Sequence, residues 1–290
     1  MGTTARPIVW SIAGSDSGAG AGLQADLKAF EALDLHGCTA VAAITAQNSV
    51  SIERVEAVAT DVLDAQLAAL ASDMAPCAIK TGLLGSVENV RCVTGWIDRL
   101  RQDRRVSLVV DPVWRASTGA ALASQEMREV MLRELLPRAT AITPNRQEAG
   151  WLLGHDLGNR AGSAAIESAA KALRALGAQA VVITGGDSGG TRSMDYLDST
   201  EARGWLSLPR VDTVHQHGSG CVFAASLAGA MALDFCVADA AIIAKMSTTQ
   251  ALRCGSGAGQ GAGPVLTCPW IFGPIIPGRR LGWGWGDAAA

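Results

Sequence analysis

Short apolar runs alternate with amphipathic stretches along most of the chain. Apolar runs that lack polar alternation predict buried strands at residues 8–13, 39–46, 77–80, 106–110, 140–143 and 179–184. Stretches in which apolar residues recur every three or four positions predict helices at 23–33, 61–72, 87–100, 125–136 and 166–176. Buried strands linked by helices are typical of a parallel sheet covered on both faces. The pattern therefore predicts an α/β fold.

The later part of the chain follows a different pattern. Residues 196–197 and 205–208 predict a hairpin at the sheet edge, and helices are expected at about 221–233 and 237–252. Because no linker or repeat divides this region, we interpret residues 1–253 as one domain. Residues 254–290 are rich in Gly and Pro and show no helical or strand period. We expect this tail to be loose or draped on the surface, and we assign it no function.

The composition of the chain argues against several classes of ligand and cellular environment. The chain has 290 residues, a net charge of −3 and no basic run, which argues against nucleic acid as a ligand. No apolar run approaches the roughly 18 residues that a membrane span needs, and the first residues do not form a secretory signal. The 7 cysteines show no close pair and no metal-ligand spacing with the 4 histidines. An odd number of cysteines without a targeting segment indicates free thiols in a reducing cytoplasm.

The first segment with chemical potential is glycine-rich. Residues 12–26 read I-A-G-S-D-S-G-A-G-A-G-L-Q-A-D and connect a predicted strand to a predicted helix. Backbone amides of such a loop can approach a ligand closely because glycine has no Cβ atom. A dinucleotide fingerprint does not fit, because Leu23 stands where its third glycine belongs. A flexible turn is the simpler interpretation, and Asp26 could merely favour the helix dipole.

A second segment, residues 45–49, follows the next predicted strand. Its Gln47 offers a donor and an acceptor together, which suits the edge of a heterocycle. A polar loop residue without a ligand remains the alternative.

The third segment begins a helix after the strand at 140–143. Asn145 and Glu148 have the spacing of a capping box. A carboxylate at this place could also hold a magnesium ion near nucleotide phosphates, directly or through water. The two interpretations are compatible.

The fourth segment is H-G-S-G-C-V at residues 217–222, where the first late helix begins. Small residues at a helix start leave backbone N–H groups free to face an anion, such as a phosphoryl group in transfer. Cys221 lies in the first turn, where the helix dipole would lower its thiol pKa and make it a proton acceptor for a substrate hydroxyl. The alternative is a small buried thiol beside a tight turn.

In their order and spacing, these segments resemble hydroxymethylpyrimidine/phosphomethylpyrimidine kinases, the thiamine-biosynthesis branch of the ribokinase-like superfamily. The likeness extends from about residue 8 to about residue 252, and residues 217–221 are similar to the family's H-G-T-G-C block. Cys221 stands where most of the superfamily has Asp. The resemblance implies a ribokinase-like three-layer α/β/α sandwich with a central, mostly parallel sheet.

The resemblance also implies an activity. A member of this family uses ATP and Mg²⁺ to phosphorylate 4-amino-5-hydroxymethyl-2-methylpyrimidine and then its monophosphate. The substrate-binding residues implied are Gly14, Asp26, Gln47 and Val113. The implied anion hole is Gly218, Ser219 and Gly220, with Cys221 as the base. The residues implied for ATP and its phosphates are Asn145, Glu148, Asp111 and Lys80, with Glu148 also serving magnesium.

Departures from the family pattern keep other functions open. Ser219 replaces the usual Thr, and Trp114 and Arg115 replace smaller apolar residues. Residues 184–187, T-G-G-D, replace a form often seen as K-G-G-H, which weakens any nucleotide contact expected there. The alternatives are a pyridoxal or pyridoxamine kinase of the same fold and a catalytically silent pyrimidine-binding module. A homodimer is kept open as the oligomeric state.

Overall fold

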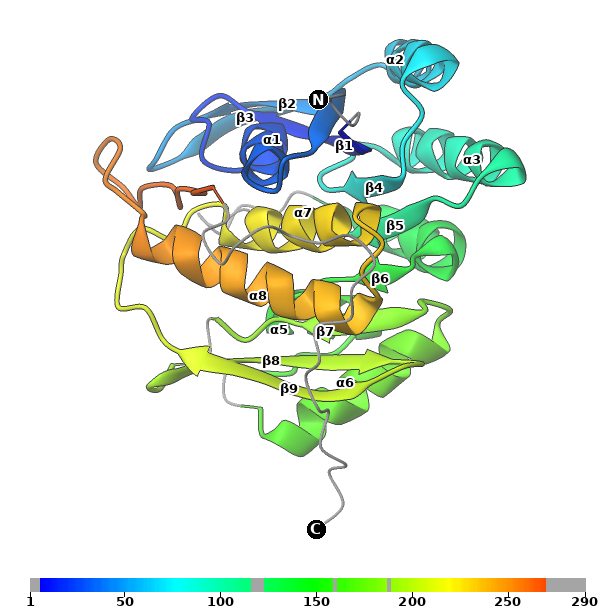
Figure 1. Ribbon diagram of the computed structural model, residues 1–290. Helices are drawn as coiled ribbons and strands as arrows, with labels where there is room; N and C mark the ends of the chain where they lie inside the picture. Colours follow the sequence, from blue (N-terminus) through cyan, green and yellow to red (C-terminus); the bar gives the residue numbers. More distant parts are fainter. Residues whose placement is uncertain (1–5, 116–122, 159–160, 187–188, 270–290) are drawn as a thin grey trace, which may run out of the picture.

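A single nine-stranded sheet forms the centre of the protein (Figure 1). The computed structural model describes residues 6–115, 123–158, 161–186 and 189–269. The strand order is β3-β2-β1-β4-β5-β6-β7-β8-β9. The strands are β1 (Ile8–Asp16), β2 (His36–Gln47), β3 (Ile52–Ala57), β4 (Ala78–Thr81), β5 (Ser107–Val110), β6 (Ala141–Ile142), β7 (Ala180–Ile183), β8 (Arg192–Ser199) and β9 (Arg203–Pro209). Strands β2, β1, β4, β5, β6 and β7 are parallel, which confirms the predicted mostly parallel sheet.

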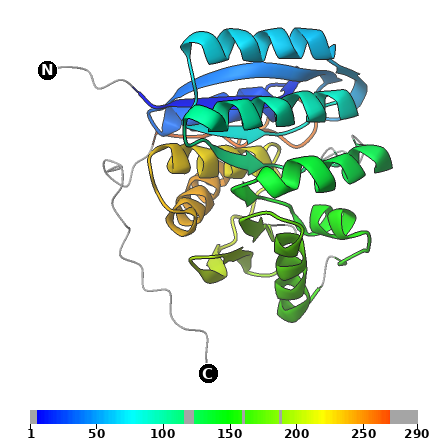
Figure 2. The ribbon, with the colours of Figure 1, turned by 90° about the vertical axis from the view of Figure 1, so that its right-hand side faces the viewer.

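Helices cover both faces of this sheet, as the two views show (Figures 1 and 2). One face carries α1 (Gly22–Ala32), α7 (Ser219–Ala232) and α8 (Val237–Arg253). The other carries α2 (Thr60–Asp73), α3 (Val87–Asp103), α4 (Gln125–Val130), α5 (Arg146–Leu153) and α6 (Ser163–Ala175). Within the described ranges, none of these helices combines the length and apolarity needed to cross a membrane.

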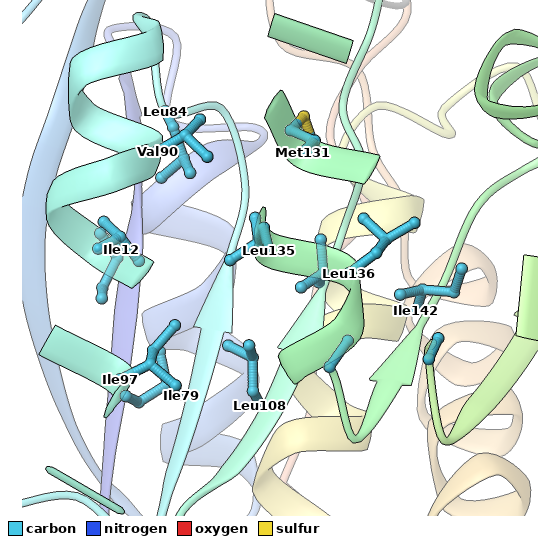
Figure 3. Packing of buried hydrophobic residues seen from close by; sticks show 14 of the residues in the cluster. Ile12, Ile79, Leu84, Val90, Ile97, Leu108, Met131, Leu135, Leu136 and Ile142 are labelled. Atoms are coloured by element: carbon cyan, nitrogen blue, oxygen red, sulfur yellow. The ribbon is translucent and has the colours of Figure 1, made fainter. Parts of the chain in front are cut away.

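Successive strand residues pack on opposite faces of the sheet. In β1, Trp10 and Ile12 belong to the core beneath α3, whereas Val9 belongs to the core beneath α1 and α7. Figure 3 shows Ile79 of β4 packed near Ile97 of α3 in the first of these cores. Because both faces are buried, the strands need apolar residues at consecutive positions. This is why they appear in the sequence as continuous apolar runs.

Two elements differ from the expected pattern. The predicted helix at 125–136 is α-helical only as far as Val130 and continues as a π-helical turn and a 3₁₀ turn that ends at Arg138. Pro137 has no N–H to donate, so a regular α-helical ladder cannot continue through it. Strand β3 was not predicted, because it lies antiparallel at the sheet edge with its residues mostly exposed and therefore lacks an apolar signal.

The chain after α8 returns to the body of the protein. Val265 is only 3% exposed and packs against Ala25, Val222 and Ala251. Its backbone N–H donates to the carbonyl of His217 at 3.0 Å, and His217 donates in turn to the carbonyl of Gly263 at 3.2 Å. Of the two expectations for the tail, residues 254–269 therefore fit the one draped on the surface and not the loose one, and main-chain pairing replaces the missing apolar pattern. Residues 270–290 lie outside the described part of the chain.

The C-terminal segment (residues 254–269) joins two loops that are distant in sequence. The backbone N–H of Gly261 donates to Ser49 Oγ, after β2, at 3.1 Å. The N–H of Gly263 donates to His215 Nδ1, before α7, at 3.0 Å. Two free cysteines, Cys254 at the start of the segment and Cys268 near its end, lie close together. Their Sγ atoms are 3.2 Å apart.

Truncation after Arg253 is expected to lower the melting temperature by roughly 5 °C, because it exposes the surface beneath Val265 and removes the bonds to His217. Thermal unfolding followed by circular dichroism measures the effect. Truncation after Pro269 is the matched control, because it keeps the C-terminal segment and should melt close to the full chain. Equal melting temperatures for the two truncated proteins would contradict a stabilising contribution from the segment.

Candidate active site

A cavity of about 570 Å³ opens at the carboxyl ends of the parallel strands, where open α/β sheets usually bind ligands. It brings together all four segments that the sequence singled out. The predicted site residues that line it are Gly14, Gln47, Lys80, Asp111, Val113, Asn145, Glu148, Gly218, Ser219, Gly220 and Cys221. Asp26 is the one predicted site residue that does not line it.

The glycine-rich loop and the loop before α7 pack backbone against backbone. Gly22 and Gly218 have φ angles of +57° and +81°, in the left-handed region that favours glycine. A side chain on Gly218 would overlap the carbonyl of Gly20. A side chain on Gly20 would overlap the His217 ring, so Gly20 and Gly218 are required by this close approach, which places the start of α7 beside the end of β1.

Asp16, at the end of β1, organises the glycine-rich loop. Its carboxylate accepts backbone hydrogen bonds from Gly18, Gly20 and Ala21 at 2.8–3.0 Å. It also contacts the Nε2 atom of His217 at 3.0 Å. Burial raises the pKa of Asp16, but the bonds from His217 and the loop amides outweigh burial and leave that pKa below its usual range. Sequence analysis missed Asp16, although it stands within the motif at residues 12–26.

Gln47 lies at the same end of the cavity, next to His217. The Nε2 atoms of the two side chains are 3.2 Å apart. The backbone of Gln47 is held by Ser17, whose Oγ donates to its carbonyl at 2.7 Å and accepts from its N–H at 2.8 Å. The predicted position of Gln47 beside a ligand is compatible with this geometry. His217 is a second polar side chain at this place, and sequence analysis predicted no role for it.

A buried charge cluster lies beneath the cavity. The Nζ atom of Lys80 is 2.9 and 3.0 Å from the carboxylate oxygens of Asp26 and 3.6 Å from Asp111. Burial alone would lower the pKa of Lys80, but Asp26, Cys221 and Asp111 raise it, so the ammonium stays charged. Burial raises the pKa of both carboxyls, an effect that Lys80 opposes. Lys80 is thus the counter-ion that keeps two carboxylates in the interior.

Asp26 does not face the cavity, so the predicted contact with a pyrimidine does not fit the structure. Asp26 is fully buried in α1, where it pairs with Lys80 and accepts a hydrogen bond from Ser11. Its side chain points into the interior between α1 and the sheet, because its position in the first turns of α1 places it on the helix face that covers β1 and β4. It reaches the cavity only through Lys80, which lines the floor.

Cys221 faces the cavity from the first turn of α7. The expectation of a lowered thiol pKa is wrong. Removal of the thiol from bulk solvent raises its pKa to about 12, with Lys80 lowering it and Asp111 and Asp26 raising it. The helix dipole is weaker than this desolvation together with two nearby carboxylates. Cys221 is therefore a protonated thiol near neutral pH, hydrogen-bonded to Asp111.

The start of α7 has the form expected of an anion site. Gly218 is its N-cap residue, and no side chain of the described residues caps this end of the helix. A side chain added at Gly220 would meet only open space. The N-terminus of a helix carries partial positive charge, so an anion in this space would be stabilised by the dipole and by backbone N–H groups.

Asn145 and Glu148 form the predicted capping box at the start of α5. Asn145 Oδ1 accepts from the Glu148 N–H at 2.9 Å, and Glu148 Oε2 accepts from the Asn145 N–H at 2.8 Å. Thr143 lies just before them, is 4% exposed and lines the same cavity. Its hydroxyl has no hydrogen-bond partner among the described residues. A buried oxygen that faces a cavity without a partner can serve a bound ion, water or phosphate.

The departures from the family pattern lie at the rim of the cavity. Val113 and Trp114 both line it, and Trp114 stacks on Trp151 with ring centroids 5.6 Å apart. The Arg115 guanidinium lies 4.2 Å from the Trp114 ring centroid. Trp114 therefore packs on Trp151 of α5 while it lines the cavity. At the other departure, Thr184 lines the cavity, whereas Asp187 lies outside the described residues.

Known proteins resemble this chain over most of its length. The family model described as phosphomethylpyrimidine kinase matches residues 16–266. The hydroxymethylpyrimidine/phosphomethylpyrimidine kinase of Synechococcus elongatus is 42% identical over 262 residues, which cover 90% of this chain and 97% of that one. The enzyme of the same name from Bacillus subtilis is 36% identical over 256 residues, covering 88% and 92%.

Solved structures give the same fold. A pyridoxal kinase from Staphylococcus aureus in complex with ADP superposes with a TM-score of 0.81 at 33% identity, covering 90% of this chain and 93% of that one. A phosphomethylpyrimidine kinase from Clostridium difficile superposes with a TM-score of 0.73 at 28% identity, covering 85% and 100%. The ribokinase-like sandwich is thereby confirmed, and the chain belongs to the phosphomethylpyrimidine kinase family.

Proposed function

We propose that this protein transfers the γ-phosphoryl group of ATP to the hydroxymethyl group of 4-amino-5-hydroxymethyl-2-methylpyrimidine, and then phosphorylates the resulting monophosphate. This reaction gives the pyrimidine diphosphate used in thiamine synthesis. The proposal is supported by relatives that are named after both pyrimidine substrates and that align with about nine-tenths of the chain.

One observation carries the proposal within the site. Gln47 ends β2 and Glu148 follows β6, on opposite sides of β1, β4 and β5 in the sheet, and α7, whose first turn carries Cys221, packs on those three middle strands. A heterocycle beside Gln47 would direct its hydroxymethyl arm toward Cys221. ATP phosphates beside Glu148 would direct their terminal group toward Gly220. The two substrates would then meet at the start of α7, where the helix dipole and backbone donors can stabilise the charge of the transferring group.

The residues on the phosphate side fit a magnesium ion that accompanies ATP. The described residues contain no group of three His, Cys, Asp or Glu side chains that could hold a metal ion alone. Magnesium in kinases typically uses one or two carboxylates, waters and the substrate phosphates. Glu148, Asp111 and the unpartnered hydroxyl of Thr143 provide such oxygens. When bound, the ion would neutralise phosphate charge, while the chain's own groups hold the nucleotide in place.

Replacing Glu148 by Gln is expected to separate its contribution to helix capping from its contribution to magnesium binding. Gln can occupy the same place in a capping box, so the melting temperature should stay close to wild type. Loss of the charge should lower kcat by roughly 10-fold or more and raise the magnesium concentration needed for half-maximal rate. Steady-state kinetics over a magnesium titration measures both. Unchanged kinetics at limiting magnesium would show that Glu148 caps the helix and does not serve the metal ion.

Pyridoxal phosphorylation is the second candidate, favoured by a specific observation. The structures with TM-scores near 0.8 are pyridoxal kinases, including one in complex with a nucleotide analogue and pyridoxal. A pyridine with a hydroxymethyl arm would occupy the same cavity and present the same reacting hydroxyl. The catalytically silent alternative would require a site that binds ligand without turnover.

The deciding experiment compares three acceptors under one set of conditions. Purified protein is incubated with ATP, magnesium and either the pyrimidine alcohol, its monophosphate or pyridoxal, and phosphorylated products are identified by mass spectrometry. We expect product from both pyrimidines, with a kcat/KM at least 10-fold above that for pyridoxal. Preference for pyridoxal would assign the second function, and binding of all three acceptors without product would identify a silent module.

A further inference from the structure

Asp16 is a carboxylate with four polar contacts, three of which come from backbone N–H donors and one from a histidine ring nitrogen. Backbone N–H groups of Gly18, Gly20 and Ala21 point at its two oxygens. Donors converging on a carboxylate stabilise its charged form, and its pKa is accordingly depressed. Asp16 Oδ2 therefore has no proton to share with the fourth neighbour, the Nε2 atom of His217 at 3.0 Å.

The proton in that contact must therefore lie on the histidine. An imidazole nitrogen that carries a hydrogen has no lone pair with which to accept a second one. The amide nitrogen of Gln47, 3.2 Å from the same Nε2 atom, consequently cannot donate to it. A half-turn of the terminal amide exchanges its oxygen and nitrogen without moving any other atom. The orientation compatible with His217 has Gln47 Oε1 toward the ring and the NH₂ group toward the cavity.

The main chain on either side of the contact between Gln47 and His217 is anchored. Its backbone is held on both sides by Ser17 Oγ, at 2.7 and 2.8 Å. His217 is fixed in turn by backbone bonds to Gly263 and Val265 of the C-terminal segment. With both backbones held and the His217 ring in contact with Asp16, the proton on His217 Nε2 determines which end of the Gln47 amide can face the ring.

We propose that Asp16 and His217 are positioning residues that hold the Gln47 amide with its NH₂ group in the cavity, so that the site selects a heterocycle presenting a ring-nitrogen lone pair at that point. This inference rests on the proposed function and specifies what its acceptor must offer. A ring carbon bearing hydrogen at the same point would leave the amide donor without a partner once the heterocycle covers it, which is costly.

The test compares the pyrimidine alcohol with its two deaza analogues, in each of which one ring nitrogen is replaced by CH. In the wild-type protein, one analogue should lose about 10- to 100-fold in kcat/KM, mainly through KM, because a buried donor is left unsatisfied. In His217→Leu the amide can turn, so this ratio should fall to about 3-fold or less. Asp16→Ala should have the same effect, because it removes the acceptor that holds the proton on His217 Nε2. His217→Gln places an N–H donor near the original Nε2 position and should restore the discrimination.

Gln24→Leu is the matched control. Gln24 accepts from the Asp16 N–H at 3.0 Å and donates to Ser15 Oγ at 2.8 Å, so its loss disturbs the same loop without touching His217. This variant should keep the wild-type ratio, and the KM for ATP should be similar in all four variants. Discrimination that persists in His217→Leu and Asp16→Ala would overturn the proposal. Wild-type protein that fails to phosphorylate the pyrimidine alcohol would instead refute the proposed function, which separates the two outcomes.

Discussion

Replacing Lys80 by Met is expected to destabilise the protein by about 3–5 kcal/mol, the range measured when one partner of a buried ion pair is removed. Lys80 is fully buried and is the counter-ion of Asp26 and Asp111. Met fills a similar volume but leaves two interior carboxylates without a positive charge. For a chain of this size, the melting temperature should fall by roughly 10 °C. Chemical denaturation and thermal unfolding at pH 7.5 measure the effect.

The same variant should show a characteristic pH dependence. Burial already holds the carboxyl pKa of Asp26 and Asp111 above the usual range, and removal of Lys80 should raise both further. A carboxyl whose folded pKa exceeds its unfolded pKa favours folding as it takes up a proton, so the deficit of the Lys80→Met protein should shrink as the pH falls from 8 toward 5.

Two further variants make this result specific. Adding Asp26→Asn to Lys80→Met should recover part of the lost stability, because one uncompensated charge is removed. Arg54→Met is the surface control, since the Arg54–Glu56 pair is exposed and should contribute less than about 1 kcal/mol. A Lys80→Met protein that melts like wild type at pH 7.5 would show that the carboxyls are neutral in the fold and need no counter-ion.

The parts of the fold that the sequence predicted are those with strong local signals. Strands such as β1 and β4 are buried on both faces, so each appears as an apolar run. Four polar or glycine-rich segments follow such runs or begin a helix, and parallel strands bring their carboxyl ends to one edge. The cavity was predictable in this way without knowledge of any contact. Strand β3 was not, because an exposed edge strand has no buried face to mark it.

The errors in the site share a physical cause, which is interaction between residues far apart in the chain. Asp26 follows the glycine-rich loop directly, but its partner Lys80 is 54 positions away and draws the carboxylate inward. The position of Cys221 at a helix start predicts a lowered pKa, whereas burial and charges from other elements raise it. His217 bonds to Asp16, 201 positions earlier. Neither spacing nor composition carries information about these pairs.

Cys221→Ala is expected to reduce turnover by roughly 10²–10⁴-fold, the usual contribution of a group that transfers a proton in the transition state. The thiol faces the cavity at the start of α7 and is hydrogen-bonded to Asp111. KM for ATP and the pyrimidine should change little, because the anion site is built from backbone and Gln47 lies at the far end. Melting curves should confirm that the fold is kept.

The raised pKa of Cys221 changes what chemical modification should show. A thiol with a pKa of about 12 is almost entirely protonated at pH 7.5, so it should react with iodoacetamide more slowly than the exposed Cys77. The sequence alone suggested the opposite order. Peptide mapping by mass spectrometry after timed alkylation gives both rates in one experiment. Faster modification of Cys221 would show that its surroundings stabilise the thiolate after all.

The pH profile then tests whether Cys221 removes the proton of the substrate hydroxyl. Only the thiolate can accept that proton, and its fraction grows about tenfold per pH unit below a pKa near 12. Since kcat/KM follows the ionisation of the free enzyme, its logarithm should rise with a slope near 1 between pH 6.5 and 9. Cys221→Asp carries a carboxyl group, which ionises at lower pH than the thiol in the same surroundings, so it should retain part of the activity with a flatter profile. A rising profile that survives in Cys221→Asp would assign the ionisation to another group, and near-normal turnover in Cys221→Ala would remove proton transfer from this thiol altogether.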